Sequence, residues 1–433
     1  MEREVVAVGG FIVLFGLMAL RVPIGIAMGL VGVGGFAMLS TPDAALSLLA
    51  LTPIRTATDY SLGLVPMFIL MGALATRSGM SEELFRASNA WLGHRKGGLA
   101  MATIAACGGF AAICGSSVAT AATMANVALP EMRRFGYSDA MASGTIAAGG
   151  TLGILIPPSV VLAIYGIITE QDIGRLFIAG IAPGLLALCL YLLLIQILVF
   201  VKPDSLPVGE RTEWRGRMQA LRGVWAILLL FVFVIGGIYG GMFTPTEAAG
   251  MGAAGTFLIG VARRRLTWRS TMECLVGSLR TSASIFVVLI GAMLFGYFLA
   301  VTQTPQNLTQ WLVGLNLGPY GTLSIILVAY ILLGCILDAM AMIVLTVPII
   351  FPVVSAYGFD PIWFGVIVVM TVELGLITPP IGMNVFVINS VAKDVSLPTI
   401  FRGVLPFVAI DVVRLVVLVA FPAITLFLVH RMG

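Results

Sequence analysis

Ionisable side chains are scarce in this sequence. Only 10% of its 433 residues are Asp, Glu, Lys or Arg, whereas a soluble domain contains about 25%. This deficit argues against an ordinary soluble protein. The net charge of +4 does not indicate a nucleic-acid partner, because the basic residues are confined to short connections between apolar segments, where membrane orientation requires them.

Histidine and cysteine are also few. The two histidines, His94 and His430, lie near the ends of apolar segments. The sequence offers no histidine pair, carboxylate pair or Cys–His set of the kind that hydrolytic or metal chemistry needs, so we do not expect an enzyme. The five cysteines show no metal-binding spacing and are predicted to be small apolar residues without disulfides: Cys107, Cys114, Cys189, Cys274 and Cys335.

Apolar residues are abundant and make up 59% of the chain. They form runs of membrane-spanning length, and runs such as VWAILLLFVFVIGGIYGG lack the alternation of a transmembrane β-barrel. We therefore predict an all-α polytopic membrane protein, whose first apolar run is a spanning helix and not a cleaved signal peptide. The predicted apolar segments are 4–20, 23–40, 60–77, 99–128, 138–170, 175–201, 223–243, 246–262, 275–300, 321–351, 360–392 and 402–430.

Two of the less regular segments predict special elements. Segment 99–128 is rich in Gly, Ala, Ser and Thr and has CGSS near its middle, so we predict a packed re-entrant hairpin and not a lipid-facing helix. Segment 78–96 is charged on one side and apolar on the other, which is typical of an amphipathic helix in the membrane interface.

The chain contains a diverged internal repeat. Shifting the sequence by 222 residues superimposes Pro157-Pro158 on Pro379-Pro380 and Gly153 on Gly375. The similarity extends over about 115–183 and 333–406.

The distribution of charge predicts that the two repeats are inverted. Arginines and lysine flank the first hairpin, whereas the corresponding connections of the second half, including TQTPQNLTQWLVGLNLGPYG, carry no charge. Positive charge marks the cytoplasmic side of a membrane, so corresponding loops are predicted to lie on opposite sides. The connection 202–222, with five basic residues, is predicted to be cytoplasmic.

The proline pairs interrupt otherwise apolar helices. Proline removes a hydrogen bond and clashes with the preceding turn, and an opened backbone is tolerated in a membrane only where polar groups take it up. Freed carbonyls suit a hard cation such as sodium, and half-helix N-termini suit a carboxylate. Two broken helices at matching places in inverted repeats are typical of secondary transporters. A plain packing kink is the alternative.

Three stretches resemble the large membrane subunit of tripartite ATP-independent periplasmic (TRAP) transporters: GSSVATAATMANVALPEMRRFGYSDAMASGTIAAGGTLGILIPPSVVLAIYG, GGMFTPTEAAGMGA and LGLITPPIGMNVFVINSVA. The resemblance runs over essentially the whole chain. It implies a sodium-driven elevator-type transporter in the bacterial inner membrane that takes up a small organic acid. It also implies two partners, a separate small membrane (Q) subunit with four helices and a soluble periplasmic substrate-binding (P) protein.

The resemblance implies two sodium sites, each between a hairpin tip and a broken helix. The expected ligand positions of the first site are Ser116, Ser117, Gly153, Ile156 and Pro158; those of the second are Gly375, Thr378 and Pro380, beside a second hairpin whose tip falls near 334–338. The expected substrate contacts are Asp338, Ser117 and Asn384. Cys114 stands where the family usually has serine, so mainly backbone ligands are expected there.

Several charged residues within apolar segments have alternative explanations. Asp338 is a functional candidate by default, because a carboxylate in an apolar segment is costly, and the alternative is a cap on the hairpin turn. Glu373 is a candidate support for the second site, whereas Glu247 is expected to lie in a capped first helical turn. Asp411 and Arg414, one turn apart, are expected to pair.

The predicted organisation follows from these features. Scaffold helices occupy 1–96 and 223–320, the linker occupies 202–222, and the two transport halves occupy 97–201, broken at 153–158, and 321–433, broken at 375–380. A stand-alone sodium–dicarboxylate symporter of the related two-hairpin architecture is the nearest alternative. A membrane-embedded enzyme or a channel is less favoured.

Overall fold

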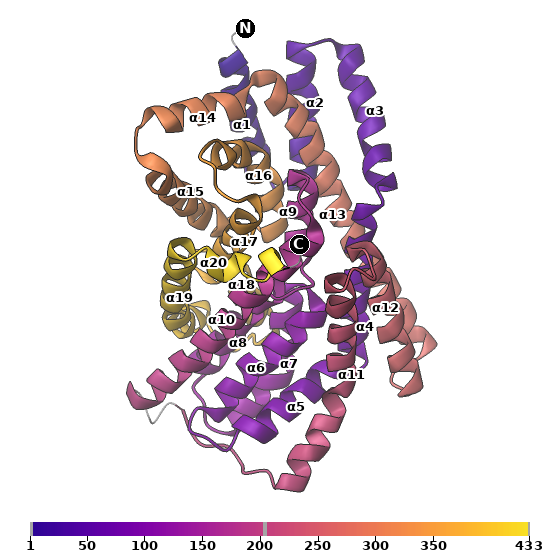
Figure 1. The fold of residues 1–433 in the computed structure, drawn as a ribbon, viewed down its shortest axis with the longest axis vertical. Coiled ribbons are helices and arrows are strands. Elements are labelled where there is room, and N and C mark those ends of the chain that lie inside the picture. The colour runs from indigo at the N-terminus through magenta and orange to yellow at the C-terminus, as the bar shows by residue number, and fades with distance from the viewer. Residues whose placement is uncertain (1–2, 202–205, 432–433) are drawn as a thin grey trace.

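The computed structural model describes residues 3–201 and 206–431, and these are folded almost entirely into helices (Figure 1). The residues of the predicted linker from 202 to 205, and the last two residues of the second transport half, lie outside the described residues. The helices are α1 (Arg3–Ala19), α2 (Ile24–Leu39), α3 (Pro42–Thr58), α4 (Leu64–Arg77), α5 (Met80–Leu92), α6 (Gly98–Cys114), α7 (Ser117–Arg134), α8 (Asp139–Leu155), α9 (Val160–Thr169), α10 (Ile173–Val201), α11 (Trp214–Tyr239), α12 (Pro245–Ala262), α13 (Trp268–Thr302), α14 (Thr304–Gly314), α15 (Gly318–Gly334), α16 (Ala339–Ala356), α17 (Pro361–Ile377), α18 (Met383–Val391), α19 (Leu397–Ala420) and α20 (Ala423–Leu426).

The apolar helices confirm a polytopic membrane protein. Within the described residues, six helical segments are long and apolar enough to cross a membrane, and a seventh is added if α3 and α4, bent by 62° to each other, form one span. The segment Asp139–Thr169, which contains the first proline pair, is one of the six. All five cysteines are free thiols.

Two helices lie where no apolar segment was predicted. Helix α3 begins after Thr41, whose side chain caps it by accepting a hydrogen bond from Ala44 N. Helix α14 falls within the connection 301–320 and follows α13 directly. Both were missed because their apolar residues are interspersed with polar ones, and hydropathy alone does not detect such helices.

The two predicted repeats contain helices in the same order. Helices α7, α8–α9 and α10 of the first half correspond to α16, α17–α18 and α19 of the second. Helices α5, α6 and α7 lie toward the lower end of the molecule in Figure 1, whereas α14, α15 and α16 lie toward the upper end. These two sets correspond, because each consists of the three helices that precede a broken helix. An inverted repeat would place them at opposite ends in this way.

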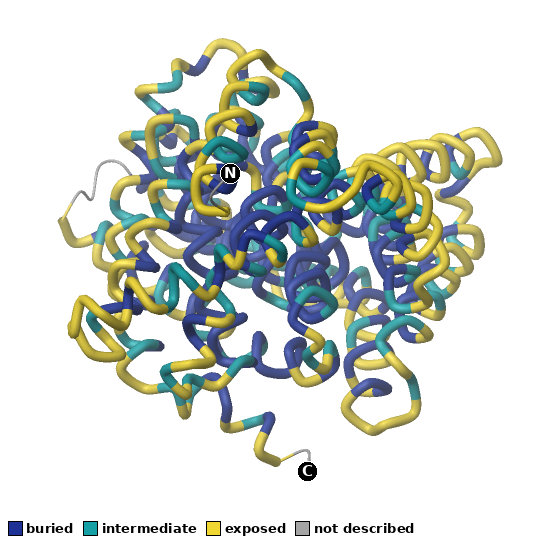
Figure 2. The backbone as a smooth tube through the Cα atoms, turned by 90° about the horizontal axis from the view of Figure 1, so that it is seen from above, coloured by how far each residue is buried: buried dark blue, intermediate teal, exposed yellow. Residues whose placement is uncertain are grey.

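The core of the molecule is formed around α8 and α17. All residues of α17 from Ile362 to Ile377, and those of α8 from Ala142 to Leu155, are buried. Seen from above, buried residues concentrate at the centre and exposed residues at the periphery (Figure 2). A helix that is apolar all round is expected in such a position, so these two broken helices form the centre on which the site is built.

Helix α5 has a different role from a purely interfacial helix. Its apolar face, which includes Leu84 and Phe85, is buried and packs against α6 and α11. Protein packing therefore accounts for the amphipathic pattern of segment 78–96.

Candidate functional site

The first hairpin tip lies directly against the first broken helix. Helix α6 ends at Cys114 and α7 begins at Ser117, with Gly115 between them in the left-handed region at φ 62°. A Cβ on Gly115 would lie 2.7 Å from the carbonyl oxygen of Pro158, and one on Gly153 would lie 2.6 Å from that of Ser116. Glycine is thus required on both sides of this contact. The backbone carbonyls of Ser116 and Pro158 lie at the contact.

The first helix break begins later than predicted. Helix α8 continues through Gly153 to Leu155, and Ile156 is its C-cap residue, so the open backbone lies at 156–159 and not from Gly153 onward. Ser159 bridges the opening: its hydroxyl donates to the carbonyl of Ile154 over 2.5 Å and accepts from Leu162 N at 3.2 Å. The side chain of Ser159 thereby supplies bonds that the prolines Pro157 and Pro158 cannot make.

The second hairpin repeats this contact with glycine on both sides. Helix α15 ends at Gly334, and a Cβ on Gly375 would lie 2.6 Å from the backbone of Gly334. Helix α17 extends to Ile377, so this break also begins after the glycine, at Thr378. The Thr378 hydroxyl donates to the carbonyl of Leu374 at 2.5 Å.

The two breaks differ in exposure. Pro157 and Pro158 are buried, whereas Pro379 and Pro380 are exposed. Both Pro-Pro peptide bonds are cis. The predicted ligand position Pro380 therefore faces outward in this conformation, while Pro158 lies against the first hairpin.

Asp338 caps a helix at the second hairpin tip. Its Oδ1 accepts hydrogen bonds from the backbone nitrogens of Met340 and Ala341, both at 3.0 Å. The contacts of Oδ1 are therefore those of a helix cap, as the alternative explanation of Asp338 predicts. Asp338 is nevertheless exposed to a cavity, so the cap and a contact with a ligand are compatible.

Asn384 connects the two halves. Its Nδ2 donates to the Ser117 hydroxyl at 2.6 Å and to the carbonyl of Ala147 at 3.3 Å. Both side chains are buried, and Asn384 Oδ1 has no hydrogen-bond partner among the described residues. A buried amide oxygen without a partner is costly, and this one lies beside the first hairpin tip.

A small cavity brings the predicted elements together. Its volume is about 150 Å³, and both hairpin tips and both broken helices line it, facing α4 and α13. Ser116, Ser117 and Asp338 are among its lining residues. Gly153, Pro158 and Gly375 lie at the hairpin–break contacts and not in the cavity lining, and Ile156, Thr378 and Pro380 are also absent from that lining. The lining residues that sequence reasoning missed include Ile69, Val160, Val161, Thr281 and Ile285.

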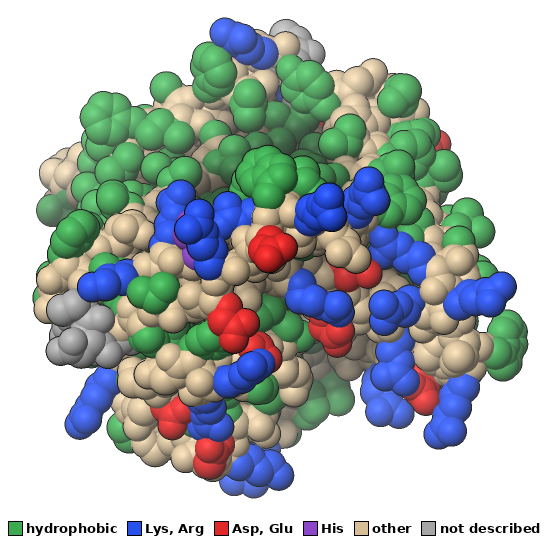
Figure 3. Space-filling view, turned by 90° about the horizontal axis from the view of Figure 1, so that it is seen from below, with side chains coloured by type: hydrophobic (Ala, Val, Ile, Leu, Met, Phe, Trp, Pro, Cys, Tyr) green, Lys and Arg blue, Asp and Glu red, His purple; other side chains and the backbone are tan. Residues whose placement is uncertain are grey.

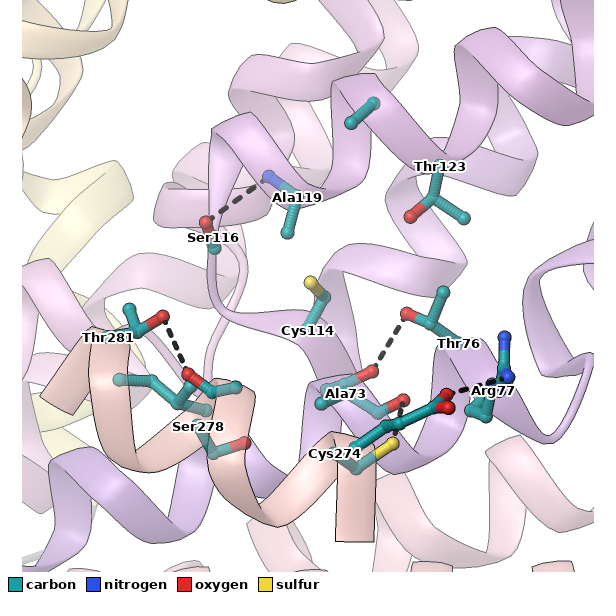
Figure 4. Close-up of a pocket in the computed structure, with 15 residues that line it drawn as sticks. Ala73, Thr76, Arg77, Cys114, Ser116, Ala119, Thr123, Cys274, Ser278 and Thr281 are labelled. Carbon is teal, nitrogen blue, oxygen red and sulfur yellow. Dashed lines mark hydrogen bonds and ion pairs between the residues drawn. The ribbon is translucent and has the colours of Figure 1, made fainter. Parts of the chain in front are cut away.

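A larger cavity of about 510 Å³ adjoins the first one, sharing Ile69, Ser116 and Thr281 with it. Figure 4 shows Ser116 and Thr123 on the hairpin side and Ser278 and Thr281 on α13 around the same space. This cavity extends to the ion pair between Arg77 and Glu273, 2.9 Å apart. The stretch GSLRT in α13, which contains Ser278 and Thr281, was the available sequence signal for the α13 side of this cavity.

A buried polar chain joins Thr151 and Glu373, the residues two positions before Gly153 and Gly375. Arg414 lies 3.1 Å from Glu373 and 3.2 Å from Asp411. Tyr191 donates to Asp411 at 2.6 Å and lies 3.2 Å from the hydroxyl of Thr151. The expected Asp411–Arg414 pair is confirmed, and Glu373 joins it. Glu373 thus has a buried arginine partner.

Outside the core, charged residues make two further sets of contacts, the first of which was predicted. Thr244 and Glu247 form a capping box at the start of α12, which confirms the structural role of Glu247. Arg133 lies 2.7 Å from both Asp139 and Asp394 and so joins the end of α7 to the connection after α18. The hydrogen bond from Arg133 holds the pKa of Asp394 below its usual value.

Comparisons with known proteins agree with this architecture. Residues 11–424 match the family model "Tripartite ATP-independent periplasmic transporter, DctM component". The C4-dicarboxylate TRAP transporter large permease protein DctM of Pseudomonas aeruginosa is 37% identical over 398 residues, covering 92% of both chains. The isethionate TRAP transporter permease protein DctMQ of Oleidesulfovibrio alaskensis is 34% identical over 434 residues, covering 96% of this chain and 66% of the relative.

A solved structure shows the same fold at low sequence identity. The YdaH transporter of Alcanivorax borkumensis superimposes with a TM-score of 0.58 at 16% identity, covering 88% of this chain and 90% of that one. At this identity the similarity concerns the fold alone.

Proposed function

This chain belongs to the DctM component family of tripartite ATP-independent periplasmic transporters, and from this membership we propose that it carries out sodium-driven uptake of a small organic acid. It is the large membrane subunit of such a system in the bacterial inner membrane. The substrate arrives on a periplasmic binding protein, and a four-helix small membrane subunit completes the complex. The fused name DctMQ of one relative supports the pairing of large and small subunits.

The observation that carries the proposal is the cavity of about 150 Å³ between the hairpin tips, the breaks and the scaffold helices α4 and α13. Its wall combines hydroxyls and a carboxylate with apolar side chains, as small-molecule sites do. Ser117 and Asp338 are part of this wall, and Asn384 lies beside it, hydrogen-bonded to Ser117. A substrate bound here contacts both halves of the chain at once.

Sodium coupling is supported by the oxygen atoms at the two hairpin–break contacts. The Ser116 and Pro158 carbonyls lie beside the first contact, and the Gly334 carbonyl lies beside the second. Among the described residues there is no group of three or more His, Cys, Asp or Glu suited to a divalent metal. Carbonyl and hydroxyl oxygens are the ligands by which broken helices hold sodium in transporters.

An elevator movement is supported by the position of the cavity. One wall consists of hairpins and broken helices, and the opposite wall of α4 and α13. In this movement the hairpins and broken helices slide against α4 and α13. A substrate bound to the hairpins and broken helices keeps its contacts with them while it crosses the membrane. The adjoining 510 Å³ cavity, which reaches Arg77, then corresponds to the release path toward the cytoplasm.

Sodium binding is tested on the purified protein without knowledge of the substrate. We expect sodium chloride to raise the unfolding temperature above that in equimolar potassium chloride, because a bound ligand stabilises the folded state. The same unfolding temperature in both salts would contradict sodium binding.

Transport is tested in proteoliposomes that contain both membrane subunits, with the binding protein outside and succinate as the first of a panel of organic acids. Each sodium ion that enters down about 100 mV releases about 2.3 kcal/mol, so uptake should require a sodium gradient and no ATP. Undiminished uptake in sodium-free buffer would overturn the mechanism. Uptake without the binding protein would favour the stand-alone symporter.

A further inference from the structure

The connection before α11 is fastened to the turn between α5 and α6. Gly97 N donates to the carbonyl of Leu206 at 3.3 Å, Gly209 N donates to that of Gly93 at 3.0 Å, and Lys96 pairs with Val208 in an antiparallel bridge. The linker is therefore held against the protein at this point, and its basic residues have defined positions.

Arg217 occupies a position formed by several contacts at this junction. Its Nε donates to the carbonyl of Thr212 at 3.2 Å, and its Nη2 lies 3.4 Å from His94 Nδ1. Its guanidinium lies 5.9 Å from the centre of the Trp91 ring, which packs edge-on against Trp214 at 5.7 Å. These contacts orient the guanidinium without neutralising it.

The junction carries an excess of positive charge. Among residues 3–201 and 206–431, no acidic partner forms an ion pair with the five basic residues of this region, which are Arg95, Lys96, Arg211, Arg215 and Arg217. Burial, followed by the charges of Arg217, Arg95 and Arg211, lowers the pKa of His94. Figure 3 shows Lys and Arg side chains gathered on this end of the molecule.

A surface hollow lies beside this charge. Its volume is about 280 Å³, and it is lined by Arg211, Thr212, Glu213, Trp214 and Arg217. Glu213 is the one carboxylate in this lining, against two arginines. Trp214 is 64% exposed, and exposed tryptophan beside basic residues is typical of the membrane–water boundary.

We propose that this hollow binds the phosphate headgroup of an anionic phospholipid, with Arg211 and Arg217 as the phosphate ligands and Trp214 alongside the glycerol and upper acyl chain. Arginine binds phosphate through two parallel N–H donors. Basic residues next to spanning helices attract anionic lipids. A bound lipid would anchor the linker, which joins the two halves of the chain, to the membrane surface.

The test uses the purified complex of large and small subunits, with lipid binding counted by native mass spectrometry. Dioleoylphosphatidylglycerol is titrated against dioleoylphosphatidylcholine, and inorganic phosphate is added in a separate arm. We expect saturable binding of the anionic lipid, weakened about fivefold for each arginine replaced in Arg211→Gln and Arg217→Gln. The exposed Arg211→Gln variant alone gives the answer if Arg217→Gln impairs folding.

The matched control is the double variant Arg264→Gln and Arg265→Gln, which removes the same charge from the turn between α12 and α13. It should keep wild-type affinity for phosphatidylglycerol. Equal weakening in this control would mean that only net charge matters and would overturn the site. Unchanged lipid binding in Arg211→Gln would also overturn the site. If inorganic phosphate competes fully with the lipid through the same arginines, the ligand is free phosphate and the lipid assignment is wrong. None of these outcomes depends on transport or on sodium.

Discussion

The amide of Asn384 donates a hydrogen bond of 2.6 Å to the hydroxyl of Ser117, joining helix α18 of the second half to the tip of the first hairpin. The two residues are 267 positions apart in the chain, and both are buried. This hydrogen bond therefore links the two halves of the chain directly beside the first hairpin tip.

Replacement of Asn384 by Ala should lower both stability and uptake. The change leaves Ser117 and the carbonyl of Ala147 without their donor, and an unsatisfied buried group costs about 1–3 kcal/mol. Unfolding and proteoliposome uptake measure the two effects. Asn126→Ala is the control, because Asn126 is exposed and bonds only to its own helix at Ala122. Equal behaviour of the two variants would contradict a special role for Asn384.

Asp338 is best tested by two variants. Asp338→Asn keeps a side chain that caps α16 but removes the charge from the cavity, so we expect stability close to wild type and strongly reduced uptake. Asp338→Ala should lose uptake and, in addition, about 1 kcal/mol of stability. Normal uptake by the asparagine variant would show that the carboxylate serves only as a cap.

The proline pairs should act through the backbone. Replacing Pro157 and Pro158 with Ala favours a continuous helix by about 3 kcal/mol per residue, which would turn the carbonyl of position 158, now beside Gly115 of the hairpin tip, away from the hairpin. We expect good expression but reduced stabilisation by sodium, and the same for Pro379 and Pro380. Pro130→Ala is the control, since Pro130 lies inside α7 without a break. Wild-type sodium stabilisation in both double variants would identify the prolines as packing kinks.

Arg414 should be important for stability. Arg414→Met leaves Glu373 and Asp411 buried without their cation, which costs about 3–5 kcal/mol. Arg269→Met should change stability by less than about 1 kcal/mol, because Arg269 is 92% exposed in its pair with Glu273. The additional change Glu373→Gln should restore part of the loss. Chemical unfolding in detergent measures all three, and equal stability of the two methionine variants would exclude the buried cluster as a major contribution.

The orientation of the chain can be measured by cysteine labelling. Glu210→Cys is placed in the linker and Gln310→Cys in α14, both at exposed positions, in a background that lacks the exposed Cys189. We expect labelling of position 310 from outside intact cells and of position 210 only after permeabilisation, because basic loops remain cytoplasmic. The reverse pattern would invert the predicted topology.

The sequence alone was sufficient for the features that depend on local chemistry. Long apolar runs predict membrane helices because a backbone in lipid must satisfy its own hydrogen bonds. The pairs Pro157-Pro158 and Pro379-Pro380 predict the breaks because proline lacks the N–H that continues a helix. The hairpin tips near 115 and 334–338 were located by their small residues and by the repeat, and helices end at both places.

The tertiary structure decided which groups meet. The sequence contains Glu373, Thr151 and Arg414 without any indication that one polar chain connects them, since such contacts depend on how α8, α10, α17 and α19 pack. The breaks begin three residues beyond Gly153 and Gly375, so these glycines lie within the helices, and only the tertiary structure shows that each packs against a hairpin tip. Local propensity determines where a helix is interrupted, but the partners of a buried polar atom are determined by the neighbours that remain once water has been excluded.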